Sequence, residues 1–195
     1  MSYILVLYYS SGGTTKELAQ LIARGVEEQG LEAMIRTVPR ISPNNEATDS
    51  EIPSDGDCYV SLEELENSAG IALGSPSRFG NMAAPLKYFI EQTSSIWMNG
   101  KLAGKPISFF SSSSSMHGGQ ESTLLTSMVP FLHHGMLIVG TPYSETQLLR
   151  TETGGTPYGV THWNGDDNSN PISTDEKSLA ISQGKRLASL AKKLN

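Results

Sequence analysis

The feature that most constrains the fold of this chain is a strand that stops at a serine- and glycine-rich loop and continues directly into a helix. Residues 3–9 are a continuous run of apolar and β-favouring side chains, which the sequence Ser-Ser-Gly-Gly ends. Residues 14–29 then carry apolar side chains at helical spacing, and Gly30 supplies a stop. A strand without polar alternation that leads into a helix is typical of a parallel sheet buried on both faces.

The same pattern recurs along the chain. Further strands are expected at residues 32–38, 70–74, 106–110 and 136–139, and further helices at residues 84–93, 122–132 and 177–194. Alternating strands and helices predict right-handed crossovers and helices on both faces of the sheet. We therefore expect a three-layer α/β fold, with a doubly wound sheet of five parallel strands in the order 2-1-3-4-5 and ligands beyond the carboxyl ends of the strands. Residues 140–173 are interpreted as a long functional or interfacial loop.

Length and composition limit the function classes. A chain of 195 residues fits one domain, here residues 1–195, that buries roughly 70% of the surface its unfolded chain exposes. The net charge of -6 and the scattered Lys and Arg argue against a nucleic-acid footprint. No apolar run approaches the roughly 18 residues of a membrane span, the N-terminus lacks the features of a signal peptide, and the single Cys58 forms no intrachain disulfide. We therefore expect a cytoplasmic protein.

The first loop is built of hydroxyl and glycine residues at a helix N-terminus: Ser10, Ser11, Gly12, Gly13, Thr14 and Thr15. Backbone amides and the positive end of a helix dipole attract an anion at such a place. The loop has neither the Gly-Lys-[Ser/Thr] of a nucleoside triphosphatase nor the full G-x-G-x-x-G of a dinucleotide fold, so a monophosphate without a metal fits better. Taken alone, the loop is also consistent with an ordinary capped turn.

Two more loops follow strands at the same edge of the predicted sheet. The second loop contains Pro76, Ser77, Arg78, Phe79, Gly80 and Asn81, and the third spans residues 111–119, five serines followed by MHGG. Phe79 is suited to wall a flat ring, and Arg78 to stabilise the negative charge that a ring acquires on reduction. The third loop is suited to follow a ribityl chain and the edge of the ring. Each loop also has a plainer interpretation. The second loop could be a surface turn with Phe79 in the core, and the third loop could be a linker.

Five motifs in order resemble one protein family. YYSSGGTT, GSPSRFGNM, GGQE at 118–121, HHGM at 133–136 and GGTPYG at 154–159 are together similar to the WrbA family of flavodoxin-like NAD(P)H:quinone oxidoreductases, over nearly the whole chain. The resemblance implies FMN as cofactor and NADH or NADPH as co-substrate. It also implies a ping-pong reaction that carries a hydride from the nicotinamide to the flavin and then to a quinone, in a homotetramer whose active sites draw on neighbouring subunits.

The resemblance also implies roles for the residues at the matching positions. Residues 10–15 would bind the FMN phosphate, and Pro76, Ser77, Arg78, Phe79 and Gly80 would border the isoalloxazine ring. The third side of the cofactor would be wrapped by Ser112, Ser113, Ser114, Ser115, Met116, His117 and Gly118. His133, the candidate catalytic residue, would reach the flavin from another subunit, and Trp97 would help to form the substrate pocket.

Three features of the sequence differ from the family pattern. Gly12 stands where members of the family commonly have an aromatic residue, the third loop is longer by one residue, and the 40–60 loop is divergent. These differences bear on the contact with the nicotinamide more than on the FMN site.

Other chemistries fit the sequence less well. His117, His133 and His134 have no acid or cysteine at ligand spacing, so we expect no metal site. The G-x-S-x-G elbow of a serine hydrolase is missing, so the serines are interpreted as hydrogen-bond donors. Two alternatives stay open: a flavodoxin-type electron carrier that binds FMN and reduces protein partners, and an assembly or regulatory module on the same fold.

Overall fold

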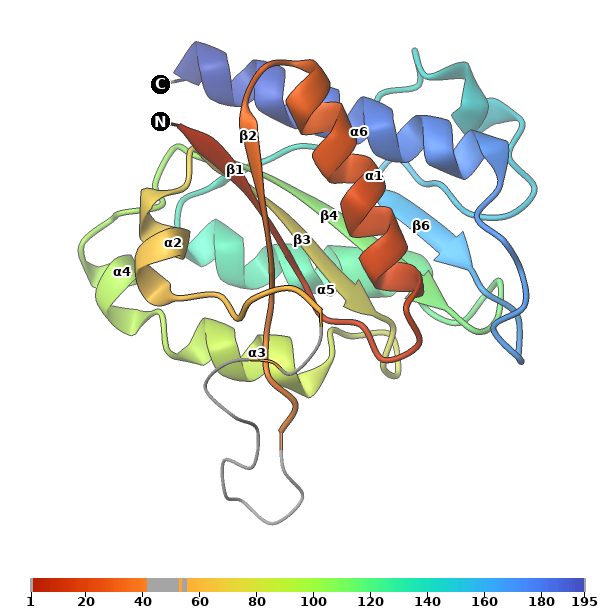
Figure 1. Cartoon of the computed structure of the whole chain (residues 1–195), viewed down its shortest axis with the longest axis horizontal. Helices are drawn as coiled ribbons and strands as arrows, with labels where there is room; N and C mark the ends of the chain where they lie inside the picture. The colour runs from red at the N-terminus through yellow and green to blue at the C-terminus, as the bar shows by residue number, and fades with distance from the viewer. Residues whose placement is uncertain (1, 42–52, 54–55, 195) are drawn as a thin grey trace.

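Strands and helices alternate in a three-layer α/β arrangement in the computed structural model, which describes residues 2–41, 53 and 56–194 (Figure 1). Part of the divergent 40–60 loop therefore lies outside the described residues. The strands are β1 (Tyr3–Tyr8), β2 (Glu32–Thr37), β3 (Gly70–Pro76), β4 (Pro106–Ser113), β5 (Leu137–Ile138) and β6 (Val160–Trp163). They pair in parallel in the order β2-β1-β3-β4-β5, with β6 also paired to β4. The predicted order 2-1-3-4-5 is confirmed, and a sixth strand is added.

Helices cover both faces of the sheet. One face carries α1 (Thr14–Glu28) and α6 (Thr174–Leu194), and the other carries α2 (Leu62–Asn67), α3 (Ala84–Glu91), α4 (Ser94–Met98) and α5 (Gln120–His133) (Figure 1). Alternate residues of β1 enter the two cores, with Val6 on the side of α1 and α6 and Leu7 on the opposite side. Of the helices that the structure describes, none is both long and apolar enough to cross a bilayer.

Helices α1 and α6 pack in direct backbone contact. A Cβ atom on Gly25 of α1 would collide with the carbonyl oxygen of Ile181, and one on Gly184 of α6 would collide with that of Ile22. One glycine on each helix, placed against the backbone of the other helix, therefore sets how closely the two helices approach.

The fifth position of the sheet is shared by two short strands. β5 pairs with Pro106 and Ile107 at the start of β4, whereas β6 pairs with its end, from Phe110 to Ser113. The segment between β5 and β6 includes a short 3-10 helix, Thr146–Leu149. Residues 140–173, expected to be a loop, therefore contain a strand of four residues that completes the sheet beside β4.

Two more elements differ from the sequence-based expectation. β4 continues to Ser113, so the first serines of the expected 111–119 loop belong to a buried central strand that is hydrogen-bonded on both edges. Helix α2 was not expected, although Ser61 and Glu64 form a capping box at its start: the Ser61 hydroxyl accepts from the Glu64 amide, and the Glu64 carboxylate accepts from the Ser61 amide. The Ser-x-x-Glu spacing of such a box is readable in the sequence.

Candidate functional site

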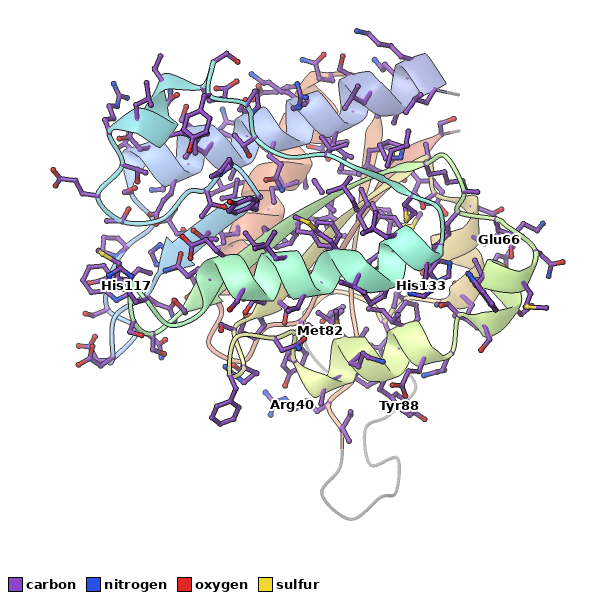
Figure 2. The ribbon with its side chains drawn as sticks, turned by 180° about the vertical axis from the view of Figure 1, so that it is seen from behind. Arg40, Glu66, Met82, Tyr88, His117 and His133 are labelled. Atoms are coloured by element: carbon purple, nitrogen blue, oxygen red, sulfur yellow. The ribbon has the colours of Figure 1, made fainter. Side chains whose placement is uncertain are left out.

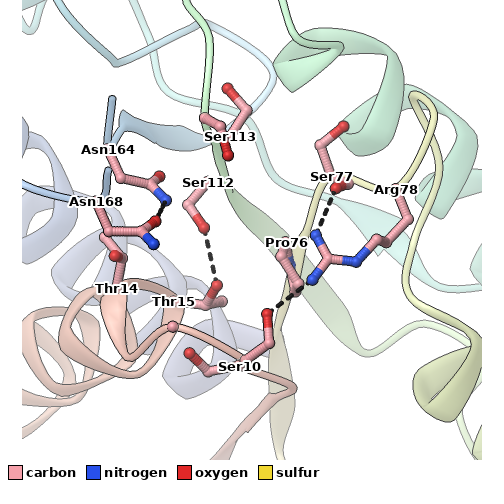
Figure 3. Close-up of a pocket in the computed structure, with 13 residues that line it drawn as sticks. Ser10, Thr14, Thr15, Pro76, Ser77, Arg78, Ser112, Ser113, Asn164 and Asn168 are labelled. Carbon is pink, nitrogen blue, oxygen red and sulfur yellow. Dashed lines mark hydrogen bonds between the residues drawn. The ribbon is translucent and has the colours of Figure 1, made fainter. Parts of the chain in front are cut away.

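A cavity of about 230 Å³ opens at the carboxyl ends of β1, β3, β4 and β6 (Figure 3). Its lining residues are Ser10, Ser11, Gly12, Thr14, Thr15, Pro76, Ser77, Arg78, Ser112, Ser113, Ser114, Asn164 and Asn168. The three loops singled out in the sequence therefore meet at one place, where the winding direction of the sheet reverses between β1 and β3. This is where ligands of doubly wound sheets bind.

The first loop presents the N-terminus of α1 to the cavity. Gly13 is the N-cap residue, with a φ of 92° in the left-handed region that favours glycine, and it supplies no side-chain cap. Its own amide donates to the Ser10 hydroxyl at 3.0 Å. The amides of the first helical turn are left for an anion, and the helix dipole adds to their attraction. The Thr15 hydroxyl, hydrogen-bonded to that of Ser112 at 3.0 Å, joins this loop to β4.

Arg78 joins the first and second loops across the mouth of the cavity. Its Nη2 donates to the Ser11 hydroxyl at 2.7 Å and its Nη1 donates to the Ser77 carbonyl at 3.0 Å (Figure 3). Among the described residues that line the cavity, Arg78 is the one cation. A negative charge that develops at this rim would therefore meet a guanidinium whose direction is already fixed.

Backbone and side-chain hydrogen bonds hold the third loop between its neighbours. The Ser77 amide donates to the Ser112 carbonyl at 2.8 Å, and the Ser77 hydroxyl donates to the Gly118 carbonyl at 2.8 Å. From the other side, the indole nitrogen of Trp163 donates to the Ser114 carbonyl at 3.1 Å. The serine loop is thus fixed to the residue after β3 and to β6.

Asn164 and Asn168 line the cavity but were not found by sequence reasoning. Asn164 follows β6 directly, and its amide donates to the Ser113 carbonyl at 2.9 Å. The Asn164 side-chain nitrogen donates to Oδ1 of Asn168 at 2.6 Å. Both residues depend on β6, which was not predicted. The available signal was the short β-favouring run Val-Thr-His-Trp, followed by a cluster of Asn, Gly and Asp turn formers.

Several residues of the predicted site flank the cavity without lining it: Gly13, Gly80, Ser115, Met116, His117 and Gly118. Phe79 does not line it either, because its side chain is fully exposed, and its φ of 54° is unusual for a residue with a side chain. The alternative in which Phe79 lies in the core is therefore wrong. Its contact with the ring stays a prediction.

His133 and Trp97 lie together, away from the cavity of their own chain. The indole nitrogen of Trp97 donates to the His133 carbonyl at 2.9 Å, and both side chains are exposed. His117 and His133 mark opposite ends of α5 (Figure 2), and a helix of 14 residues is about 20 Å long. A role at the flavin therefore requires another copy of the chain.

A second, larger cavity of about 480 Å³ lies on the other side of the first loop. Its lining includes Tyr9, Lys16 and Tyr59, and also the Asp57 carboxylate. Burial, and then the neighbouring Asp57 carboxylate, raise the pKa of Tyr8, so the Tyr8 phenol stays protonated and donates to Asp57 at 2.8 Å. This cavity lies beside one loop of the predicted site only, so the smaller cavity is the better candidate.

No three His, Cys, Asp or Glu side chains gather at metal-binding positions in the part of the chain that the structure describes. The chemistry of the first cavity is that of hydroxyls, backbone amides, carboxamides and one guanidinium. This set suits a phosphorylated ligand whose polyol part accepts and donates hydrogen bonds.

Fold and cavity together define a flavodoxin-like protein with a polar cavity at the β1/β3 switch point. A family model described as NADPH-dependent FMN reductase matches residues 3–147. A protein of Solidesulfovibrio magneticus named NAD(P)H dehydrogenase (quinone) is 39% identical over 199 aligned positions, which cover 98% of each chain. The chain belongs to the NADPH-dependent FMN reductase family, and the resemblance to WrbA-type proteins is confirmed.

Solved structures support the fold. A WrbA-like flavodoxin from Agrobacterium tumefaciens matches with a TM-score of 0.72 and 20% identity, and both chains are covered over 100% of their length. Flavodoxin 1 of Bacillus cereus matches with a TM-score of 0.63 and 17% identity, over 96% of this chain and 98% of that one. At these identities the likeness establishes the arrangement of strands and helices.

Proposed function

We propose that this chain is an FMN-dependent NAD(P)H:quinone oxidoreductase and that residues 1–195 form a single FMN-binding domain. The observation that carries the proposal is the convergence of three loops on one cavity lined by hydroxyls and amides at an uncapped helix N-terminus. The name of the full-length relative favours an enzyme over an electron carrier.

The residues present fit FMN. The first turn of α1, with the hydroxyls of Thr14 and Thr15, would hold the phosphate without a metal ion. Ser112 and Ser113 would border the ribityl chain, and Arg78 would lie at the ring. A buried oxygen at the cavity, Oδ1 of Asn164, has no hydrogen-bond donor among the described residues, which is expected where a ligand hydroxyl completes the site.

Bound FMN would supply the two-electron chemistry, in which NAD(P)H, a proton and a quinone give NAD(P)⁺ and a hydroquinone by a ping-pong hydride transfer. This chain's own residues bind and orient. The guanidinium of Arg78, fixed by Ser11 and Ser77, would favour negative charge at the rim of the cavity. His133 is the candidate acid or base, supplied by a neighbouring copy.

We also propose that the chain assembles as a homotetramer, which brings His133 and Trp97 of one copy to the cavity of another. Helix α5 carries an exposed apolar stripe, and further exposed apolar side chains lie on α4 and on α3, among them Tyr88 (Figure 2). The exposed apolar residues of these helices are Tyr88, Trp97, Met98, Leu125, Val129 and Leu132. A stripe of this kind is typical of a surface that a partner covers. A cytoplasmic location stays a prediction.

Anaerobic addition of NADPH to the yellow holoprotein tests the proposed activity. We expect rapid bleaching of the flavin absorbance, and its return when benzoquinone is added. A flavin that NADPH leaves unbleached would instead indicate the electron carrier, which needs a protein reductase. A purified protein that is colourless and ignores added FMN would indicate the assembly or regulatory module.

The role of His133 is tested separately. His133→Ala is expected to retain FMN and to lose quinone turnover. If the variant keeps both FMN and full turnover, His133 is not a catalytic residue.

A further inference from the structure

The turn after β6 brings an unpaired buried acceptor to the cavity. Asn164 is 9% exposed, and its Oδ1 has no hydrogen-bond partner among the described residues. The other polar groups of Asn164 are engaged: its amide donates to Ser113, and its side-chain nitrogen donates to Asn168. A buried carboxamide oxygen without a donor is unfavourable, so this atom is suited to a ligand that offers a hydroxyl.

Asn168 offers the complementary group. Its Oδ1 accepts from Asn164 at 2.6 Å, so its Nδ2 is directed away from Asn164 (Figure 3). A Cβ atom on Gly12 would lie 3.7 Å from both the nitrogen and the oxygen of this carboxamide, so the side chain lies beside the first loop. Asn168 therefore places an N–H donor beside the first loop, where the phosphate is expected.

The carboxamide of Asn168 also bounds the space beside Gly12. An aromatic side chain at position 12, as is common in the family, would meet the carboxamide of Asn168. In this chain the cavity is thus walled on that side by a carboxamide pair from the turn after β6, and not by an aromatic ring from the first loop.

Buried interactions fix the turn that carries both asparagines. His162 Nδ1 lies 3.1 Å from the Glu176 carboxylate, and His162 Nε2 lies 3.2 Å from the Asn170 carbonyl. Both ring nitrogens of His162 therefore have a hydrogen-bond partner. The Asn170 amide donates to the Asn164 carbonyl at 3.0 Å, which closes the turn. A wall held in this way loses little freedom when a ligand binds.

We propose that Asn164 and Asn168 form a fourth wall of the FMN site, in which Nδ2 of Asn168 donates to the phosphate and Oδ1 of Asn164 accepts from a ribityl hydroxyl. The inference rests on the proposed function in that it takes FMN as the ligand.

FMN, riboflavin and lumiflavin distinguish the contact of Asn168 with the phosphate from the contact of Asn164 with the ribityl chain. Riboflavin lacks the phosphate, and lumiflavin lacks the ribityl chain as well. Binding is measured by quenching of flavin fluorescence on titration of the apoprotein. Asn168→Asp is expected to weaken FMN by about tenfold or more, because a carboxylate replaces a donor to an anion, and to leave riboflavin within about twofold. Asn168→Ala is expected to act in the same direction on FMN.

Asn164→Leu tests the second contact. The substitution removes the acceptor but keeps a side chain of similar volume. It is expected to weaken the binding of both riboflavin and FMN and to leave the affinity for lumiflavin unchanged. Asn99→Asp is the matched control, because Asn99 is an exposed asparagine at the end of α4 and does not line the cavity. It is expected to leave all three affinities unchanged.

The inference is overturned if the wild type binds FMN and Asn168→Asp binds it equally well, or if FMN and riboflavin weaken equally in that variant. Thermal melting checks that each variant folds. If Asn168→Asp does not fold, the FMN and riboflavin affinities of Asn168→Ala are compared instead. A wild type that binds riboflavin and FMN with the same affinity also overturns it. A wild type that binds none of the flavins overturns the proposed function itself.

Discussion

At the scale of single residues, the buried pair of His162 and Glu176 couples the cavity wall to α6. The two side chains are 1% and 0% exposed, and the Glu176 carboxylate also accepts from the Ser173 amide at the start of the helix. Removing this carboxylate leaves the His162 ring and the Ser173 amide without their buried hydrogen-bond partner. The stability of the turn after β6 therefore depends on this carboxylate.

Glu176→Ala is expected to lower the free energy of unfolding by about 3 kcal/mol, measured by urea denaturation. Asp175→Ala is the matched control, because Asp175 is the adjacent carboxylate and pairs with the exposed Arg150. That exposed ion pair is expected to contribute much less to the free energy of unfolding. Equal losses in the two variants would contradict the account.

The pH dependence of stability follows from the same carboxylate. Burial raises the pKa of Glu176, but the hydrogen bonds from His162 and from the Ser173 amide outweigh it, so the pKa lies below the ordinary value of 4.5. A folded-state pKa below the unfolded one contributes stability that is present above the unfolded pKa and is lost as the pH falls through the folded pKa.

We therefore expect the free energy of unfolding of the wild type to fall below about pH 4.5, and to fall less steeply in Glu176→Gln. Urea titrations between pH 6 and about pH 3 measure both slopes. Parallel slopes would mean that Glu176 is not the group responsible.

At the scale of elements, the packing of α1 on α6 depends on glycine. Gly184→Ala puts a methyl group against the Ile22 carbonyl of α1, and separating two packed helices to make room is expected to cost about 3 kcal/mol. Ser189→Ala, on the same helix and half-buried, is the control. Thermal unfolding measures the stability of both variants. A Gly184→Ala variant as stable as the control would show that the helices do not pack this closely.

The long strands and helices were predictable because their apolar patterns are uninterrupted. β1, α1, β3, β4 and α6 all appear near their expected positions, since each buries a continuous run or a clear apolar stripe. β6 was missed because a strand of four residues gains its stability from pairing with the end of β4, which no local pattern reveals. Asn164 and Asn168 were missed with it.

The residues of the first loop, in contrast, could be predicted from the sequence because their position follows from the fold. Ser10 to Thr15 follow a buried strand and precede a helix, so the topology alone places them at the carboxyl edge of the sheet. His133 and Trp97 were assigned by resemblance only. Their distance from the cavity of their own chain could not be predicted, because it depends on where α5 ends and on how copies assemble.

At the scale of the whole molecule, the exposed stripe on α5 predicts an assembly. Val129→Glu places a charge in the middle of this stripe, and it is expected to shift sedimentation from a tetramer toward the 21.0 kDa monomer. Gln20→Glu, an exposed position on α1, serves as the control. A wild type that sediments as a monomer would contradict the proposed tetramer and the role of His133 in a neighbouring site.

The proposed function depends on the loops at the carboxyl edge of the sheet holding one FMN molecule. A crystal structure of the protein grown with FMN tests it most directly. We expect the phosphate within hydrogen-bond distance of the amides at the start of α1, and the ring beside Arg78. An FMN bound elsewhere, or a cavity that stays filled by solvent at saturating FMN, would contradict the account.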